Sequence, residues 1–286
     1  MNKKLIVILL LLTAIGSCTH DQSAQPPTQA TLPQLSIHTD LTRLCRRLIW
    51  RAYNSNYYVY TLDSTNRLKH GTIAERTNSG RYYPIDQYLI YTSNGLLEQV
   101  RELNGSSQYM YHNGQLTAIQ FSQAGKPIYC YQVSHNSGGQ IDGLRGIPLN
   151  NSGLPAYSTQ YLLDQQGRYV QLDVRTDQGA LYYRVVQSDF DNATSSPYAL
   201  IRGIPYDLNR FSWMSWGEVF PLSPHLARRI QTYQYAAPNT PTQLIKRSDL
   251  RLTYRPDPQG YMMGQFSTDA LTAIQDTVSI DYQPYH

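Results

Sequence analysis

The sequence is poor in charged residues and has no basic cluster. Aspartate, glutamate, lysine and arginine together make up 15% of the 286 residues, against about 25% in an ordinary soluble protein. The formal net charge of +4 falls to +2 if residues 1–17 are removed, because Lys3 and Lys4 leave with them. Nucleic-acid binding requires lysines and arginines gathered on one face. We therefore expect no nucleic-acid partner.

Motifs for catalysis and for cofactors are also missing. The sequence contains no GxSxG, Walker or GxGxxG motif, which removes the sequence support for nucleophile-elbow hydrolases, P-loop enzymes and dinucleotide-binding proteins. None of its 7 histidines stands in an HxxH or HExxH spacing. The segment from Asp189 to Asn192 starts like a calcium loop but lacks the glycine and the closing glutamate of that loop. We expect neither a metal ion nor another cofactor.

Tyrosine is the residue present in excess. There are 25 tyrosines, but only 5 phenylalanines and 3 tryptophans. Without the tyrosines, only about a third of the chain is hydrophobic. Much of any core must therefore consist of tyrosine rings, which bring a large apolar surface and a polar hydroxyl at the tip.

The first 18 residues have the layout of a signal peptide. Lys3 and Lys4 precede an apolar run from Leu5 to Leu12, which is too short to span a bilayer. The run is followed by Ile15-Gly16-Ser17-Cys18, which resembles the lipobox of bacterial lipoproteins. The resemblance implies that residues 1–17 are removed and that Cys18 is acylated, and more than one acyl chain makes such an anchor stable. The alternative is an ordinary secretory signal with an incidental cysteine.

The rest of the chain divides into a tether and a body. Residues 18–36 comprise Cys18 and a proline-containing segment with almost no apolar content, which is typical of a flexible linker. We expect residues 37–286 to form a single β-rich domain, held by its lipid at the outer membrane, on either the periplasmic or the surface face. Cys45 and Cys130 remain, and in an oxidising envelope they form either a disulfide or two buried thiols.

Turn signals recur through the middle of the chain. Asn94-Gly95, Asn104-Gly105, Asn113-Gly114 and Ala124-Gly125 separate short, partly alternating segments rich in tyrosine. Asn-Gly is the strongest short hairpin signal, since a type I′ turn needs a positive φ at both central residues. The pattern predicts an all-β fold, an antiparallel meander of repeated hairpins.

Three tyrosines mark the period of this repeat. Tyr91, Tyr111 and Tyr131 follow one another at intervals of 20 residues, the length of one hairpin. The pattern of Tyr-x-Tyr, a turn and then an aliphatic residue resembles the tyrosine-aspartate (YD, or RHS-like) repeat, in the short form found in lipoproteins of Bacteroidota. The chain departs from that pattern where Thr92 and His112 replace the aspartate after the second tyrosine.

Residues two apart on a strand share a face, so the rings of Tyr109 and Tyr111 align, as do those of Tyr129 and Tyr131. These four tyrosines are either the buried face of the sheet or a platform on which a ligand stacks.

Two segments break the pattern. The segment 37–52 is compatible with a helix over its first half, and the repeat context predicts a strand from about Arg47. The segment 196–229 is rich in proline and aromatic residues, so we expect an insertion that packs over the sheet. Its Trp213 and Trp216 are further candidates for ligand stacking.

These features favour a non-enzymatic envelope protein that binds a polysaccharide or an envelope protein, with its lipid as the only contact to the membrane. The resemblance implies no catalytic residue. The alternative is a surface enzyme that processes polysaccharides, with aromatic subsites and a pair of carboxylates in a cleft. A third alternative is a subunit that buries its tyrosine face against a partner.

Overall fold

The structure is a computed structural model that describes residues 45–52, 57–65, 67–76, 82–194, 196, 225–235 and 244–284. Within these residues it contains sixteen β-strands and no helix, and thus no helix that could span a membrane. The first eight strands are β1 (Cys45–Ala52), β2 (Tyr57–Leu62), β3 (Leu68–Arg76), β4 (Tyr82–Tyr91), β5 (Leu97–Arg101), β6 (Gly105–His112), β7 (Gln115–Gln123) and β8 (Lys126–His135). The other eight are β9 (Ile141–Pro148), β10 (Tyr157–Leu163), β11 (Tyr169–Thr176), β12 (Leu181–Asp191), β13 (Leu226–Tyr235), β14 (Leu244–Pro256), β15 (Met262–Asp269) and β16 (Gln275–Pro284).

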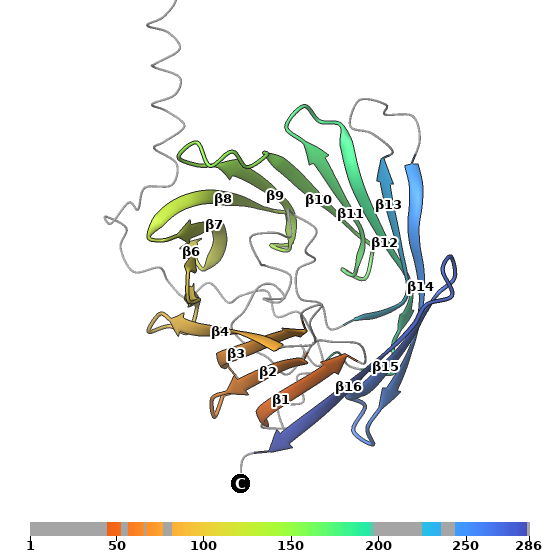
Figure 1. Ribbon diagram of the computed structural model, residues 1–286. Helices are drawn as coiled ribbons and strands as arrows, with labels where there is room; N and C mark the ends of the chain where they lie inside the picture. The colour runs from red at the N-terminus through yellow and green to blue at the C-terminus, as the bar shows by residue number, and fades with distance from the viewer. Residues whose placement is uncertain are drawn as a thin grey trace, which may run out of the picture.

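Each strand pairs antiparallel with the next, which confirms the predicted all-β meander. The sheet also closes on itself, because β1 pairs with β16 from Cys45 opposite Pro284 to Ala52 opposite Val278. Figure 1 shows the resulting barrel viewed approximately along its axis. Closure joins the two ends of the described chain, and no local turn signal could have predicted it.

The two irregular segments are described in part. The strand predicted from Arg47 is present and begins two residues earlier, at Cys45. The predicted insertion 196–229 extends too far, because its last residues from Leu226 onward belong to β13. The positions 197–224 lie outside the described residues.

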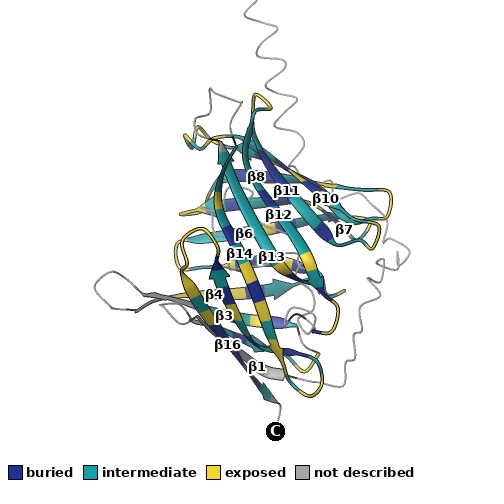
Figure 2. Cartoon of the chain, turned by 90° about the vertical axis from the view of Figure 1, so that its right-hand side faces the viewer, coloured by how far each residue is buried: buried dark blue, intermediate teal, exposed yellow. Residues whose placement is uncertain are grey.

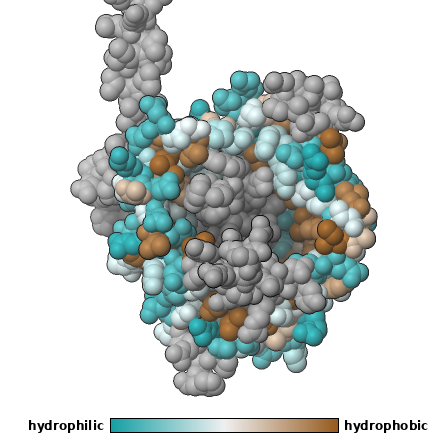
Figure 3. All heavy atoms as spheres, in the orientation of Figure 1, coloured by the Kyte–Doolittle hydropathy of each residue, from teal (hydrophilic) through white to brown (hydrophobic). Residues whose placement is uncertain are grey.

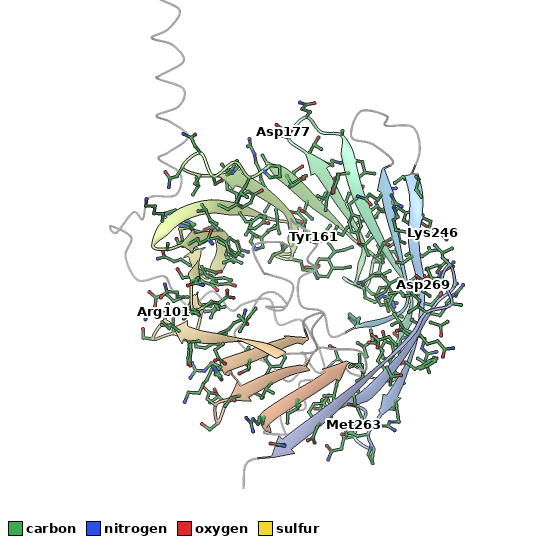
Figure 4. All side chains as sticks on the ribbon, viewed as in Figure 1. Arg101, Tyr161, Asp177, Lys246, Met263 and Asp269 are labelled. Atoms are coloured by element: carbon green, nitrogen blue, oxygen red, sulfur yellow. The ribbon has the colours of Figure 1, made fainter. Side chains whose placement is uncertain are left out.

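The strands have an inner and an outer face. Tyr161 points into the barrel and is 3% exposed (Figure 4). Directly paired residues share a face, so Leu172 opposite Tyr161 and Val185 opposite Leu172 also face inward. Buried and exposed positions follow one another along strands such as β14, as Figure 2 shows.

Tyrosine fills much of this inner face. The buried tyrosines are Tyr60, Tyr109, Tyr129, Tyr131, Tyr161, Tyr169, Tyr261 and Tyr282. Two of their hydroxyls donate to the backbone of other strands and loops: Tyr129 Oη donates to Pro155 O at 3.0 Å, and Tyr282 Oη donates to Met262 O at 2.7 Å. Tyr91 does the same to Leu68 O at 2.7 Å. A buried phenol whose hydroxyl has a partner adds apolar burial without an unsatisfied polar group.

A five-residue turn recurs at several hairpins, and its first residue holds it together. Asp164 Oδ1 accepts hydrogen bonds from the backbone N–H groups of Gln166 and Arg168, at 2.8 and 3.0 Å, while Asp164 N donates to Arg168 O. The same bonds form around Asp63, Asn136 and Asp257. In each case the side chain satisfies donors that the turn leaves without a backbone partner.

The predicted type I′ geometry holds at two of the four turn signals. Asn113 and Gly114 have φ of 49° and 77°, and Ala124 and Gly125 have φ of 49° and 75°. Of the pair Asn94-Gly95, only Gly95 has a positive φ, because this pair lies within a five-residue turn that starts at Thr92. At Asn104-Gly105 neither residue has a positive φ. The type I′ prediction was therefore wrong at these two pairs.

The Asn113→Val variant should test the first of these turns. Valine is strained at positive φ, so we expect a loss of about 1–2 kcal/mol in the free energy of unfolding. Asn104→Val is the matched control, since Asn104 is an exposed asparagine before a glycine but lacks the positive φ. Denaturant titration of both variants measures the difference. Equal stability of the two variants would show that the backbone at Asn113 is not left-handed.

A second pair of variants should test the tyrosine packing. A Cβ on Gly146 would lie 2.2 Å from Tyr129 Oη, whereas a Cβ on Gly71 would meet nothing closer than 3.5 Å. We expect Gly146→Ala to lower the free energy of unfolding by about 1–3 kcal/mol, since Tyr129 is buried and cannot move aside cheaply. Gly71→Ala should be close to neutral. A neutral Gly146→Ala variant would contradict the placement of the Tyr129 ring.

Candidate functional site

The predicted stacking tyrosines lie inside the barrel. Tyr109, Tyr129 and Tyr131 are buried, with 4%, 4% and 8% of their surface exposed, and Tyr111 is half-buried against them. Burial raises the pKa of Tyr129 to about 12, because the charged phenolate would lose its solvation. The first three rings have no face open to a ligand, which corrects their candidate stacking role. They are part of the core.

The other predicted site residues lie outside the described part of the chain. Cys18, Trp213 and Trp216 belong to segments that the structure does not describe. Cys130 is buried on β8, while the side chain of Cys45 on β1 is not described. The lipid anchor, the tryptophan sites and the disulfide therefore stay predictions.

Polar residues are frequent on the outer wall of the barrel. Gln99, Gln108 and Gln120 lie directly opposite one another across β5, β6 and β7, on the face that points away from the interior. Gln132 and Arg145 form another such pair across β8 and β9. In Figure 3, hydrophilic residues cover much of the rim, with hydrophobic ones scattered among them.

Ion pairs reinforce this wall on the opposite side of the barrel. Asp173 accepts two hydrogen bonds from Arg184 on the neighbouring strand, at 2.6 and 2.7 Å. Asp249 accepts two from Arg229, both at 2.8 Å, and a third from Lys246 at 3.0 Å. The bonds from Arg229 are the main reason that the pKa of Asp249 lies well below its ordinary value.

Two large aromatic side chains of the described residues are exposed on this wall, Tyr88 and Phe266. Tyr88 on β4 is 56% exposed, and its ring lies 4.7 Å from the imidazole of His70 on β3. His70 Nε2 lies 3.2 Å from Asp86 Oδ1, which also accepts a hydrogen bond from Thr72 Oγ1 at 2.8 Å. The sequence could have predicted that Tyr88 points outward. Side chains alternate along a strand, and Tyr88 is three residues from the inward-facing Tyr91.

A depression of about 660 Å³ is lined by residues of β5 to β8 and of the turns between these strands. Its lining includes Arg101, which lies directly opposite Tyr88 in the register of β4 and β5. Arg101 lies on the outer side of the barrel in Figure 4. Lys126, Glu102 and the hydroxyls of Ser106 and Ser122 line the same depression. The arrangement can offer hydrogen bonds, positive charge and a ring face to one ligand.

A second depression of about 510 Å³ lies over β8, β9 and β10, around Gly143. Its lining contains one carboxylate, Asp142, as the first depression contains only Glu102. Within the described ranges, no group of three histidine, cysteine, aspartate or glutamate side chains could hold a metal ion. A pair of carboxylates, which glycoside hydrolysis requires, is present in neither depression.

Comparison with known proteins places the fold. A porin-like protein from Bacteroides uniformis superposes with a TM-score of 0.55 at 10% identity, over 84% of this chain and 96% of that chain. A porin-like protein from Bacteroides vulgatus gives a TM-score of 0.50, also at 10% identity, over 85% of this chain and 100% of that one. No protein-family model and no curated protein matches the sequence. At 10% identity these likenesses show a shared fold.

The ion pairs on the outer wall should make the free energy of unfolding depend on pH. Because the folded pKa of Asp249 is lowered, its contribution is present above the ordinary pKa of about 4 and is lost as the pH falls below it. We expect Asp249→Asn to be less stable than the wild type at pH 7 and to lose less stability between about pH 5 and pH 2. Thermal unfolding at a series of pH values measures this.

Asp177→Asn is the control for this experiment. Asp177 is exposed at the tip of the turn between β11 and β12 (Figure 4). Its replacement should leave both the midpoint at neutral pH and the acid dependence unchanged. An Asp249→Asn variant that follows the same pH curve as Asp177→Asn would exclude the ion pairs of Asp249 as a source of stability.

Proposed function

We propose that this protein is a lipid-anchored, non-enzymatic protein of the cell envelope, whose barrel stands in water beside the membrane and binds a ligand on its outer wall. Cys18 supplies the anchor and residues 18–36 the tether. A glycan or another envelope protein is the ligand that this role requires.

The polarity of the two faces is the observation that carries this proposal. A barrel that crosses a bilayer presents an apolar band to the lipid and a polar interior. On the described strands, leucines and tyrosines lie inside, while glutamines, arginines and aspartates lie outside among scattered apolar side chains such as Leu162 and Phe266. The buried Asp173 and Asp249 pair with the partly exposed Arg184 and Arg229 on the outer face, where lipid would make such charges costly.

Two further observations support a place in the envelope. The solved structures with a similar fold are described as porin-like proteins of Bacteroides. The lipobox-like Ile15-Gly16-Ser17-Cys18 and the short tyrosine-rich repeats resemble lipoproteins of the same bacterial group. Fold and leader are independent features of the chain, and both favour an envelope protein.

The Cys18→Ala variant should test the anchor. Without the thiol there is no site for acylation, so we expect incorporation of a labelled fatty acid to be lost and the protein to move from the membrane fraction to the soluble fraction. The thermal midpoint should be unchanged, because Cys18 precedes the barrel. Cys45→Ala is the matched control and should keep both the label and the membrane location. A Cys18→Ala variant that still incorporates the labelled fatty acid would contradict the proposed anchor at Cys18.

A further inference from the structure

We propose that the outer wall of β4 to β8 is a binding site for an acidic polysaccharide, with Tyr88 as the stacking platform and Arg101 as the group that recognises a carboxylate. The inference rests on the proposed binding role and adds to it the place of the site and the chemical class of the ligand.

Tyr88 is held in place before any ligand arrives. Its ring packs against His70, His70 contacts Asp86, and Asp86 accepts a hydrogen bond from Thr72. A ring whose neighbours already fix its orientation loses little conformational entropy on binding. Its exposed face carries the negative side of the ring quadrupole, to which the polarised C–H face of a sugar is attracted. Tyr88 is thus a preformed stacking surface on the outer wall.

Arg101 supplies the charge next to this ring. Its Nε donates to Gln99 Oε1 at 2.8 Å, which holds the guanidinium against β5. Within the described residues its two terminal amino groups have no other partner. A guanidinium with both amino groups available matches the two oxygens of a carboxylate. Because Arg101 lies opposite Tyr88 in the strand register, one sugar chain can contact both side chains.

The adjoining depression extends the same chemistry. Lys126, Ser106 and Ser122 also line it and add a second positive charge and two hydroxyls. The single acid, Glu102, already accepts a hydrogen bond from Gln87 Nε2 at 2.8 Å. Two cations and two hydroxyls thus face a ligand, while the nearby carboxylates of Glu102 and Asp86 already accept hydrogen bonds. This balance favours a ligand with hydroxyls and negative charges.

The dimensions favour a polymer. Strands in a sheet lie about 4.8 Å apart, so Tyr88 on β4 and Lys126 on β8 are separated by roughly 19 Å along the wall. This distance exceeds the length of one monosaccharide. A chain of uronic acids would place a ring over Tyr88, a carboxylate at Arg101 and further hydroxyls and carboxylates in the depression.

The test is calorimetric titration of the full chain in detergent micelles with polygalacturonate, and with dextran as the neutral polymer. We expect polygalacturonate to bind and to weaken with added salt. Tyr88→Ala should lower the affinity about tenfold or more, and Tyr88→Phe should keep it, because the stacking face is retained. Arg101→Gln should remove the preference for the acidic polymer. Leu162→Ala, at a side chain that is likewise 56% exposed but on β10, should bind as the wild type does.

Each other outcome overturns the inference. If polygalacturonate fails to bind, or binds equally to the Tyr88→Ala and Arg101→Gln variants, the site is not where we place it. Equal binding of dextran would exclude the acidic class of ligand. Release of reducing ends during the titration would instead support the polysaccharide-processing alternative. Because the measurement is made in micelles, it does not depend on Cys18. Its result is therefore independent of the test of the lipid anchor.

Discussion

The rest of the structure depends on the closure of the sheet by pairing between β1 and β16. Closure removes both edges of the meander, so every strand has a neighbour on each side and no row of backbone groups is left unpaired. It also gives each strand one face toward the interior and one toward the surroundings. A barrel of many strands has a wide interior, and side chains that reach far inward are needed to pack it.

Tyrosine meets this need better than leucine or phenylalanine. The ring is long enough to extend over a neighbouring strand, as Tyr129 does over Gly146. Its hydroxyl then reaches a backbone carbonyl, so the polar tip is satisfied inside the barrel. The excess of tyrosine is thus a consequence of the architecture. It is not by itself evidence for a ligand, and the tyrosines of the repeat are core residues for this reason.

The outer wall is where the candidate site lies, and the same alternation puts it there. Each inward tyrosine or leucine is flanked by neighbours that point outward, and these include glutamines, arginines and aspartates beside apolar residues such as Ile90 and Leu162. Tyr88 is one of several large exposed side chains, which include Leu162 and Phe266, and it differs from them in having Arg101 opposite it in the register. Arg101 lies next to Tyr88 because β4 and β5 pair. Arg101 also lines the depression, whose other lining residues come from β5 to β8 and the turns between them.

The sequence by itself determined the strands and part of the turns. Alternation and Asn-Gly signals predicted the meander. Asn113 and Gly114 form a two-residue hairpin loop, and such a loop adopts a type I′ turn with a positive φ at both residues. At Asn94-Gly95 the side chain of Thr92 competes for the turn, and its bonds to Leu96 select another geometry. Only the tertiary structure decided the closure and which face of each strand is buried. Both depend on pairing between residues far apart in the chain, and a periodicity of two marks two faces without saying which one is inside.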